Sequence, residues 1–221
     1  LNDFIQSVIT SILSNEPYNW LICEGSSEKK YFETYFKDEI ANKKLRVIPV
    51  GGAPQIKKIY QNLLVTYDDF KKDVKGKVIL LMDTDTKLVE FETKNNDHNN
   101  LKCFRLVNYQ NKTVLVDVNK TPKTPKTEIE DALCGKTFFE TLKMFSQDEE
   151  ILKFIESINE EEITEESVYY SLDISSKKEQ ALSKIFKKEN FKFEFSEKYC
   201  KKIESNHKIP EWIMELKSHF K

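Results

Sequence analysis

Short hydrophobic runs alternate with helical patterns along the first half of the chain. Apolar residues recur at helical intervals over 3–13, from Ser26 onward and over 55–67. Five apolar runs have the length and residue types of strands: 20–23, 45–50, 77–82, 101–107 and 113–118. Because strands alternate with helices, the pattern predicts an α/β fold with a largely parallel central sheet flanked by helices.

The second half of the chain has a different pattern. Two prolines in the segment 120–126 predict a loop, and a helix is expected to begin at Glu128. Beyond it, amphipathic helices alternate with acidic and lysine-rich linkers. The chain begins without methionine, so we expect a piece of a longer protein. Its expected parts are a helix or linker from a preceding domain (1–17), an α/β core (18–136) and a mostly helical C-terminal extension (137–221).

Composition narrows the classes of protein to consider. The chain has 221 residues, of which 33% are charged, and a formal net charge of −2. No apolar run approaches the roughly 20 residues that a membrane-spanning helix needs, so no membrane association is expected. The 4 cysteines are scattered without a CxxC pair. That spacing argues against a zinc site or a disulfide framework and favours a reduced, cytoplasmic protein.

Carboxylates follow two of the predicted strands. Glu24 comes directly after the first, and Asp83 and Asp85 come directly after the third. Parallel strands present their carboxyl ends at one edge of the sheet, where such folds bind ligands. Carboxylates gathered there repel one another unless a cation is present, and oxygen ligands favour Mg²⁺ or Mn²⁺. The sequence therefore predicts a metal site, although the Asp83/Asp85 pair could instead cap the next helix.

Two further acidic positions have both a structural and a functional interpretation. Glu28 lies in the first turn of a predicted helix, where a carboxylate stabilises the helix N-terminus or completes a capping box. Glu128 and Glu130 lie at the start of the helix expected after the proline loop, and the same reasoning holds there. Metal binding and helix capping both remain open for these residues.

The acidic motifs resemble those of the Toprim domain, a Rossmann-like fold found in topoisomerases, primases and nucleases. The hydrophobic-Glu24-Gly25 strand end and the hydrophobic run that closes in Asp83-Thr-Asp85 carry the resemblance over about 18–118. The branch of the overcoming-lysogenization-defect (OLD) nucleases is the most similar. Its Glu-Gly-x-x-Glu motif matches Glu24 to Glu28, and its later Leu-Glu-x-x-Leu element resembles Ile129-Glu130-Asp-Ala-Leu133.

The resemblance implies a two-metal endonuclease that uses Mg²⁺ or Mn²⁺ on DNA, with RNA possible. Glu24, Asp83 and Asp85 would hold one ion, and Glu28 and Glu130, with Glu128, the second. A lysine near the C-terminus would stabilise developing charge, either Lys198 or Lys208. Substrate phosphates would contact lysines of the loop: Lys120, Lys123 and Lys126.

The OLD resemblance also implies partners and a biological role. Members carry an ATPase domain before the nuclease half, so the expected context is an ATPase-nuclease antiphage defence protein, as a homo-oligomer or with other defence subunits. Two other functions remain open. The chain could be a catalytically silent scaffold that binds partner proteins, or a Toprim nucleotidyl transferase of the kind found in primases.

Overall fold

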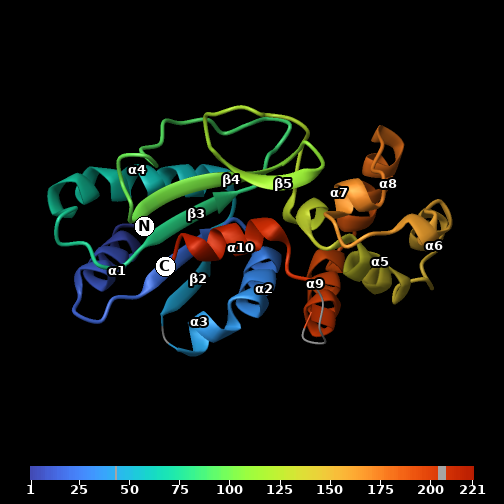
Figure 1. Ribbon diagram of the computed structural model, residues 1–221, viewed down its shortest axis with the longest axis horizontal. Helices are drawn as coiled ribbons and strands as arrows, with labels where there is room; N and C mark the ends of the chain where they lie inside the picture. The colour runs from blue at the N-terminus through green and yellow to red at the C-terminus, as the bar shows by residue number, and fades with distance from the viewer. Residues whose placement is uncertain (43, 204–207) are drawn as a thin grey trace.

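Five strands form one central sheet in the computed structural model, which describes residues 1–42, 44–203 and 208–221 (Figure 1). The strand order is β2-β1-β3-β4-β5, and only β5 runs antiparallel to its neighbour. The strands are β1 (Asn19–Cys23), β2 (Leu45–Pro49), β3 (Val78–Met82), β4 (Leu101–Tyr109) and β5 (Lys112–Asp117). The predicted α/β fold with a largely parallel, Rossmann-like sheet is confirmed.

Helices cover both faces of the sheet and form a separate group at one end of it (Figure 1). The helices beside the sheet are α1 (Asn2–Leu13), α2 (Ser26–Tyr35), α3 (Lys37–Ala41), α4 (Ala53–Phe70) and α10 (Glu211–Ser218). The others are α5 (Gly135–Lys143), α6 (Glu149–Glu156), α7 (Val168–Ser171), α8 (Ser176–Phe186) and α9 (Phe191–Ile203). In the described residues, the short 3₁₀ turn η1 (Ile129–Ala132) precedes α5, and a second, η2 (Glu160–Glu162), lies between α6 and α7.

Alternation along the strands divides the core into two layers. Successive strand residues point to opposite faces, so Trp20 and Ile22 pack with α1 and α4. Leu21 and Cys23 pack with α2 and α10 on the other face. Both ends of the chain thus contribute to the sheet core. The helix expected over 1–17 is not set apart from the core, and the extension expected over 137–221 returns to it through α10.

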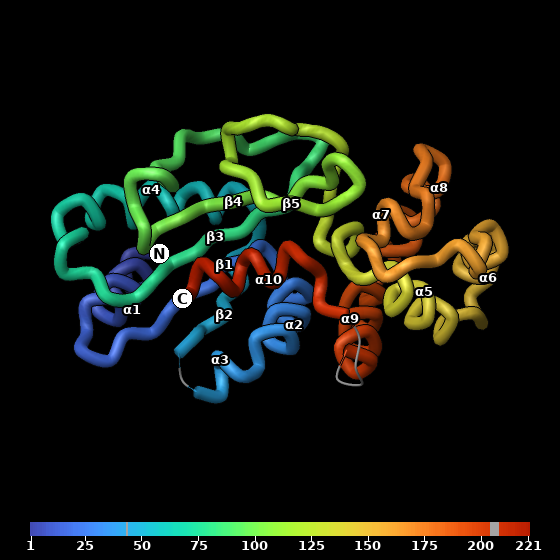
Figure 2. The backbone as a smooth tube through the Cα atoms, viewed as in Figure 1, coloured from blue at the N-terminus to red at the C-terminus, as the bar shows by residue number. Residues whose placement is uncertain are grey.

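The helix expected to begin at Glu128 is replaced by the single 3₁₀ turn η1. The Asp131 carboxylate accepts the main-chain N–H of Glu128 at 2.8 Å and closes this turn on itself. Cys134 then adopts an extended conformation and pairs with Ser167, and α5 begins only after it. The chain passes from β5 into the helical group through this segment (Figure 2).

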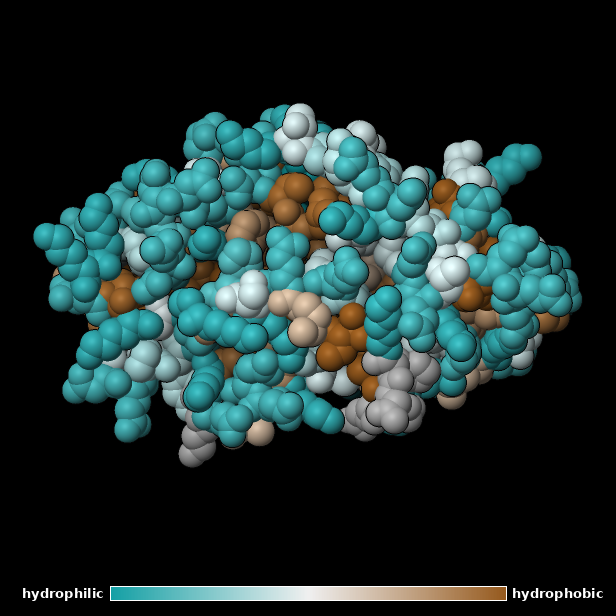
Figure 3. Space-filling view, viewed as in Figure 1, coloured by the Kyte–Doolittle hydropathy of each residue, from teal (hydrophilic) through white to brown (hydrophobic). Residues whose placement is uncertain are grey.

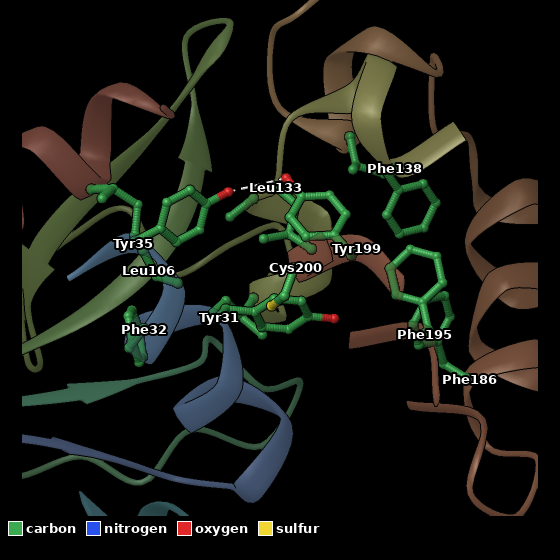
Figure 4. Packing of buried hydrophobic residues seen from close by; sticks show 14 of the residues in the cluster. Tyr31, Phe32, Tyr35, Leu106, Leu133, Phe138, Phe186, Phe195, Tyr199 and Cys200 are labelled. Atoms are coloured by element: carbon green, nitrogen blue, oxygen red, sulfur yellow. Dashed lines mark hydrogen bonds between the residues drawn. The ribbon is translucent and has the colours of Figure 1, made fainter. Parts of the chain in front are cut away.

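A buried pair of tyrosines joins the sheet layer to the helical group. The hydroxyls of Tyr35 on α2 and Tyr199 on α9 lie 3.1 Å apart, and Tyr199 also accepts the Cys134 N–H at 3.0 Å (Figure 4). The aromatic stack continues from Tyr199 through Phe195 to Phe138 and Phe186. These contacts fix α9 against α2 and α5.

The outer surface differs from this interior. On the face seen in Figure 3, hydrophilic residues predominate and hydrophobic ones form separate patches. Among the helices of residues 1–42, 44–203 and 208–221, none combines the length and the apolar character that crossing a bilayer requires.

Replacing Tyr199 by phenylalanine tests this junction. Tyr199→Phe keeps the ring but leaves the buried Cys134 N–H without an acceptor and Tyr35 without its partner. We expect a loss of about 1–3 kcal/mol in the free energy of unfolding, measured by urea denaturation. Tyr109→Phe, at an exposed ring, is the matched control and should change stability by less than about 0.5 kcal/mol. Equal effects of the two substitutions would contradict the role of Tyr199.

Candidate metal centre

Glu24 links the ends of three strands. Its main-chain carbonyl accepts the N–H groups of Gly51 and Gly52 at 2.8 and 3.2 Å, just beyond β2. Both glycines have positive φ, +87° and +107°, which explains why side-chain-bearing residues are disfavoured there. Oε1 of Glu24 accepts the main-chain N–H of Asp83 at 2.9 Å, at the end of β3. The chain leaves β1 and β3 at the topological switch point of the sheet, where ligands of such folds bind.

A two-residue bridge brings the second acidic segment to this edge. Thr84 and Thr127 exchange two main-chain hydrogen bonds of 2.9 and 2.8 Å. Because side chains alternate along extended backbone, Asp83 and Asp85 point away from the side that Thr84 faces. By the same alternation, Lys126 and Glu128 point away from the side that Thr127 faces. The bridge therefore places the Asp83/Asp85 pair beside the segment that begins at Glu128.

A buried arginine holds the lysine loop against the same bridge. The Arg105 guanidinium, 1% exposed, donates to Thr84 Oγ1 at 3.0 Å and to the Val118 carbonyl at 3.0 Å. It also donates to the carbonyl of Pro122 at 2.6 Å and to that of Lys120. Arg105 thus couples the 120–126 loop to the residue between the two aspartates.

The second acidic segment is paired with lysines. Glu128 forms ion pairs with Lys126 and with Lys192, whose Nζ lies 2.7 Å from Oε2. Glu130 is 5% exposed, and Lys192 Nζ lies 3.3 Å from its Oε2. Within the described residues, the two carboxylate oxygens of Glu130 accept no hydrogen bond. Lys192 stands at the start of α9, so this helix supplies the counter-charge to both glutamates.

The pKa shifts of the acidic side chains show that these residues are buried close to one another. Burial, followed by the charges of Glu28, Glu24 and Glu130, raises the pKa of Asp83 well above its usual range. Burial, with the charges of Glu24 and Glu130, raises the pKa of Glu28 to about 8, although its Oε2 accepts the Gly25 N–H at 2.8 Å. Burial and the charge of Asp85 raise the pKa of Glu24.

Glu128 behaves in the opposite way. Burial acts to raise its pKa, but the charges and hydrogen bonds of Lys192 and Lys126 prevail and lower it to about 2. The lysines therefore neutralise the Glu128 end of the cluster, while the carboxylates at the strand ends repel one another. The strand-end carboxyl groups are therefore harder to ionise than Glu128.

The donor set fits a hard divalent cation, because every candidate ligand is a carboxylate oxygen. As the side chains stand, no group of three Asp, Glu, His or Cys residues in the described chain is arranged to hold an ion. The carboxylates of Glu24, after β1, and Glu28, in the first turn of α2, instead accept backbone N–H groups. Glu130 has the charge of Lys192 beside it, but neither of its oxygens has a well-aligned hydrogen-bond donor among the described residues.

The structure gathers most of the site residues expected from sequence. Lys126 lies with the carboxylates, whereas Lys123 forms an ion pair with Glu90 and Lys120 is exposed. The two lysines expected to stabilise charge lie elsewhere: Lys198 Nζ sits 4.1 Å above the Phe145 ring, and Lys208 is exposed before α10. Lys192, which was not among the expected residues, lies beside the carboxylates instead. No motif surrounds it, so no sequence signal could have distinguished it from the neighbouring lysines.

The fold and the site together define a Rossmann-like α/β protein with an acidic cluster at its topological switch point. Comparison with protein-family models, curated proteins and solved structures finds no match for this chain.

The raised pKa of Glu28 makes the stability of the metal-free protein depend on pH. The pKa of about 8 lies above the ordinary value of 4.5, so protonated Glu28 stabilises the fold at low pH. This contribution is lost as the pH rises through about 8. Glu28→Gln keeps an oxygen for the Gly25 N–H and removes the charge. With EDTA present, we expect wild type to lose stability between about pH 5 and 8, and Glu28→Gln to lose at least about 1 kcal/mol less.

Urea denaturation across this pH range measures the difference. Glu33→Gln, an exposed position on the same helix, is the control and should follow wild type. Parallel curves for wild type and Glu28→Gln would show that Glu28 is not held in a repulsive environment.

Proposed function

We propose that this chain is a metal-dependent nuclease that cleaves phosphodiester bonds in nucleic acid, with DNA the favoured substrate. One observation carries the proposal: carboxylates from three separate segments of the chain share one site at the carboxyl edge of the sheet. The Glu24 carboxylate accepts the Asp83 N–H, and the Thr84–Thr127 bridge adds the segment with Glu130. Such a concentration of buried negative charge costs stability unless cations compensate it.

Two groups of ligands follow from these positions. Glu24, Asp83 and Asp85 would hold one Mg²⁺ or Mn²⁺ ion, because Glu24 contacts Asp83 directly and lies within the field of Asp85. Glu28, Glu130 and Glu128 would hold the second. Bound there, such ions supply an activated water and neutralise charge on the cleaved phosphodiester. The resemblance to Toprim motifs in the same residues supports this assignment.

Lysine side chains near the site would bind the phosphates of the substrate. Lys192 lies among the acidic residues and is our candidate for stabilising charge on the phosphate, in place of Lys198. Lys120 and Lys123 lie on the exposed loop that Arg105 anchors, and Lys126 borders the acidic cluster. Contacts between these lysines and the phosphate backbone would make binding salt-dependent and largely independent of sequence.

Plasmid nicking tests the nuclease directly. With Mn²⁺, we expect wild type to convert supercoiled plasmid to nicked and linear forms, and EDTA to abolish the reaction. Asp83→Asn and Glu24→Gln should each lower the rate by about 100-fold or more, since each removes a charge that the site needs. Glu33→Gln, on the outer side of α2, should cut at the wild-type rate. Cleavage that survives both site substitutions would come from another site or a contaminant and would refute the proposal.

The biological context follows from the resemblance to OLD nucleases. We propose that the chain acts with an ATPase domain as the effector of an antiphage defence protein. Cells that express the complete protein should restrict phage plating, and Asp85→Ala should restore plaques to the number on cells without it. Full restriction by the Asp85→Ala protein would show that cleavage at this site is not how the defence works.

A further inference from the structure

Lys192 already occupies a cation position within the acidic cluster. Its Nζ lies 2.7 Å from Glu128 Oε2 and 3.3 Å from Glu130 Oε2, so one ammonium bridges two carboxylates. The other oxygen of Glu128 is paired with Lys126. Two carboxylates that share one positive charge form the arrangement in which a divalent cation would be expected.

The Glu130 side of this bridge is incompletely satisfied. Glu130 is buried, and neither of its oxygens accepts a hydrogen bond from the described residues. The Lys192 ammonium pairs with it in charge at 3.3 Å, without a well-aligned hydrogen bond. The fully buried hydroxyl of Tyr31 also has no partner among the described residues and, in Figure 4, points away from the Tyr35–Tyr199 pair. Buried polar atoms without hydrogen bonds are costly, so a further polar group or ion at this place would be stabilised there.

Space for such a group exists beside the glutamates. A recess of about 30 Å³ is lined by residues of the segment 126–131, of α5 and of α8, including Glu128, Glu130 and Asp131. That volume accommodates one or two water-sized species.

We infer that Lys192 is a built-in counter-ion that fills the second cation position of the metal-free protein and must leave Glu130 before a divalent ion binds there. The inference rests on the proposed function and concerns how the same site is regulated. An ammonium and a divalent ion at one carboxylate pair would repel each other strongly in this buried setting. The first position, at Glu24, Asp83 and Asp85, has no such occupant among the described residues and fills first.

The position of Lys192 allows this exchange. It is the second residue of α9, and its side chain is 40% exposed, so the ammonium has a path to solvent. A lysine is a flexible point charge, and the released ammonium can pair with a phosphate of the substrate. Ion and substrate then bind cooperatively, because the phosphate stabilises the displaced lysine. The second position thus loads fully when nucleic acid is present.

Mn²⁺ binding measured by calorimetry and by electron paramagnetic resonance tests the inference on the whole chain without substrate. We expect wild type to bind one ion tightly and a second at least about tenfold more weakly. Lys192→Met should tighten the second ion by about tenfold or more and leave the first unchanged. Lys192→Arg, which keeps the charge, should bind both ions as wild type does. Lys198→Met, on the same helix but stacked on Phe145, is the matched control and should also resemble wild type.

Several outcomes would overturn the inference. Unchanged or weaker binding of the second ion to folded Lys192→Met would show that the lysine does not compete with it. A crystal structure of wild type with Mn²⁺ gives a second test that requires no substitution: the Lys192 Nζ should lie beyond hydrogen-bond distance of Glu130, with an ion in its place. Two bound ions with the ammonium still on Glu130 would refute the exchange. Absence of any Mn²⁺ binding to wild type would refute both proposals. If wild type cleaves DNA but Lys192→Met binds ions just as wild type does, only the inference about Lys192 is refuted.

Discussion

Repulsion among carboxylates at the end of the sheet is the constraint around which the structure is organised. The fold collects these groups because adjacent parallel strands end at one edge and because Glu24 accepts the N–H of Asp83. The lysines of the site compensate only part of the negative charge. They lower the pKa of Glu128, whereas the pKa values of Glu24, Glu28 and Asp83 remain raised. The acidic cluster therefore lowers the stability of the fold, as is typical of functional sites.

The surrounding structure makes this concentration of charge tolerable. The tyrosines of α2 and α9, together with the aromatic stack behind them, hold the two helices that carry Glu28 and Lys192. The carboxylates therefore cannot relax by separating. In the metal-free protein proton uptake relieves their repulsion, as the raised pKa values show, and a bound cation would relieve it in another way. Aromatic packing between α2 and α9 thus keeps the carboxylates close together despite their repulsion.

The sequence predicted what depends on local pattern. Each strand was recognisable because a short apolar run between polar turns is typical of a buried strand, and Glu24, Asp83 and Asp85 could be placed because they follow such runs. What depends on distant contacts could not be predicted. The turn at Glu128 is short because its own Asp131 closes it, and Lys192 reaches the site only because α9 packs on α2. The covering of the sheet by α1 and α10 likewise depends on packing between the ends of the chain.

Arg105 has a consequence that extends beyond the site. One guanidinium holds both the carbonyls of the proline-containing loop and the hydroxyl of Thr84, so these parts form a single mechanical unit. The loop and the segment with the two aspartates therefore cannot separate without breaking a hydrogen bond of Arg105. Truncation of this one side chain would release the loop and the backbone between the aspartates together.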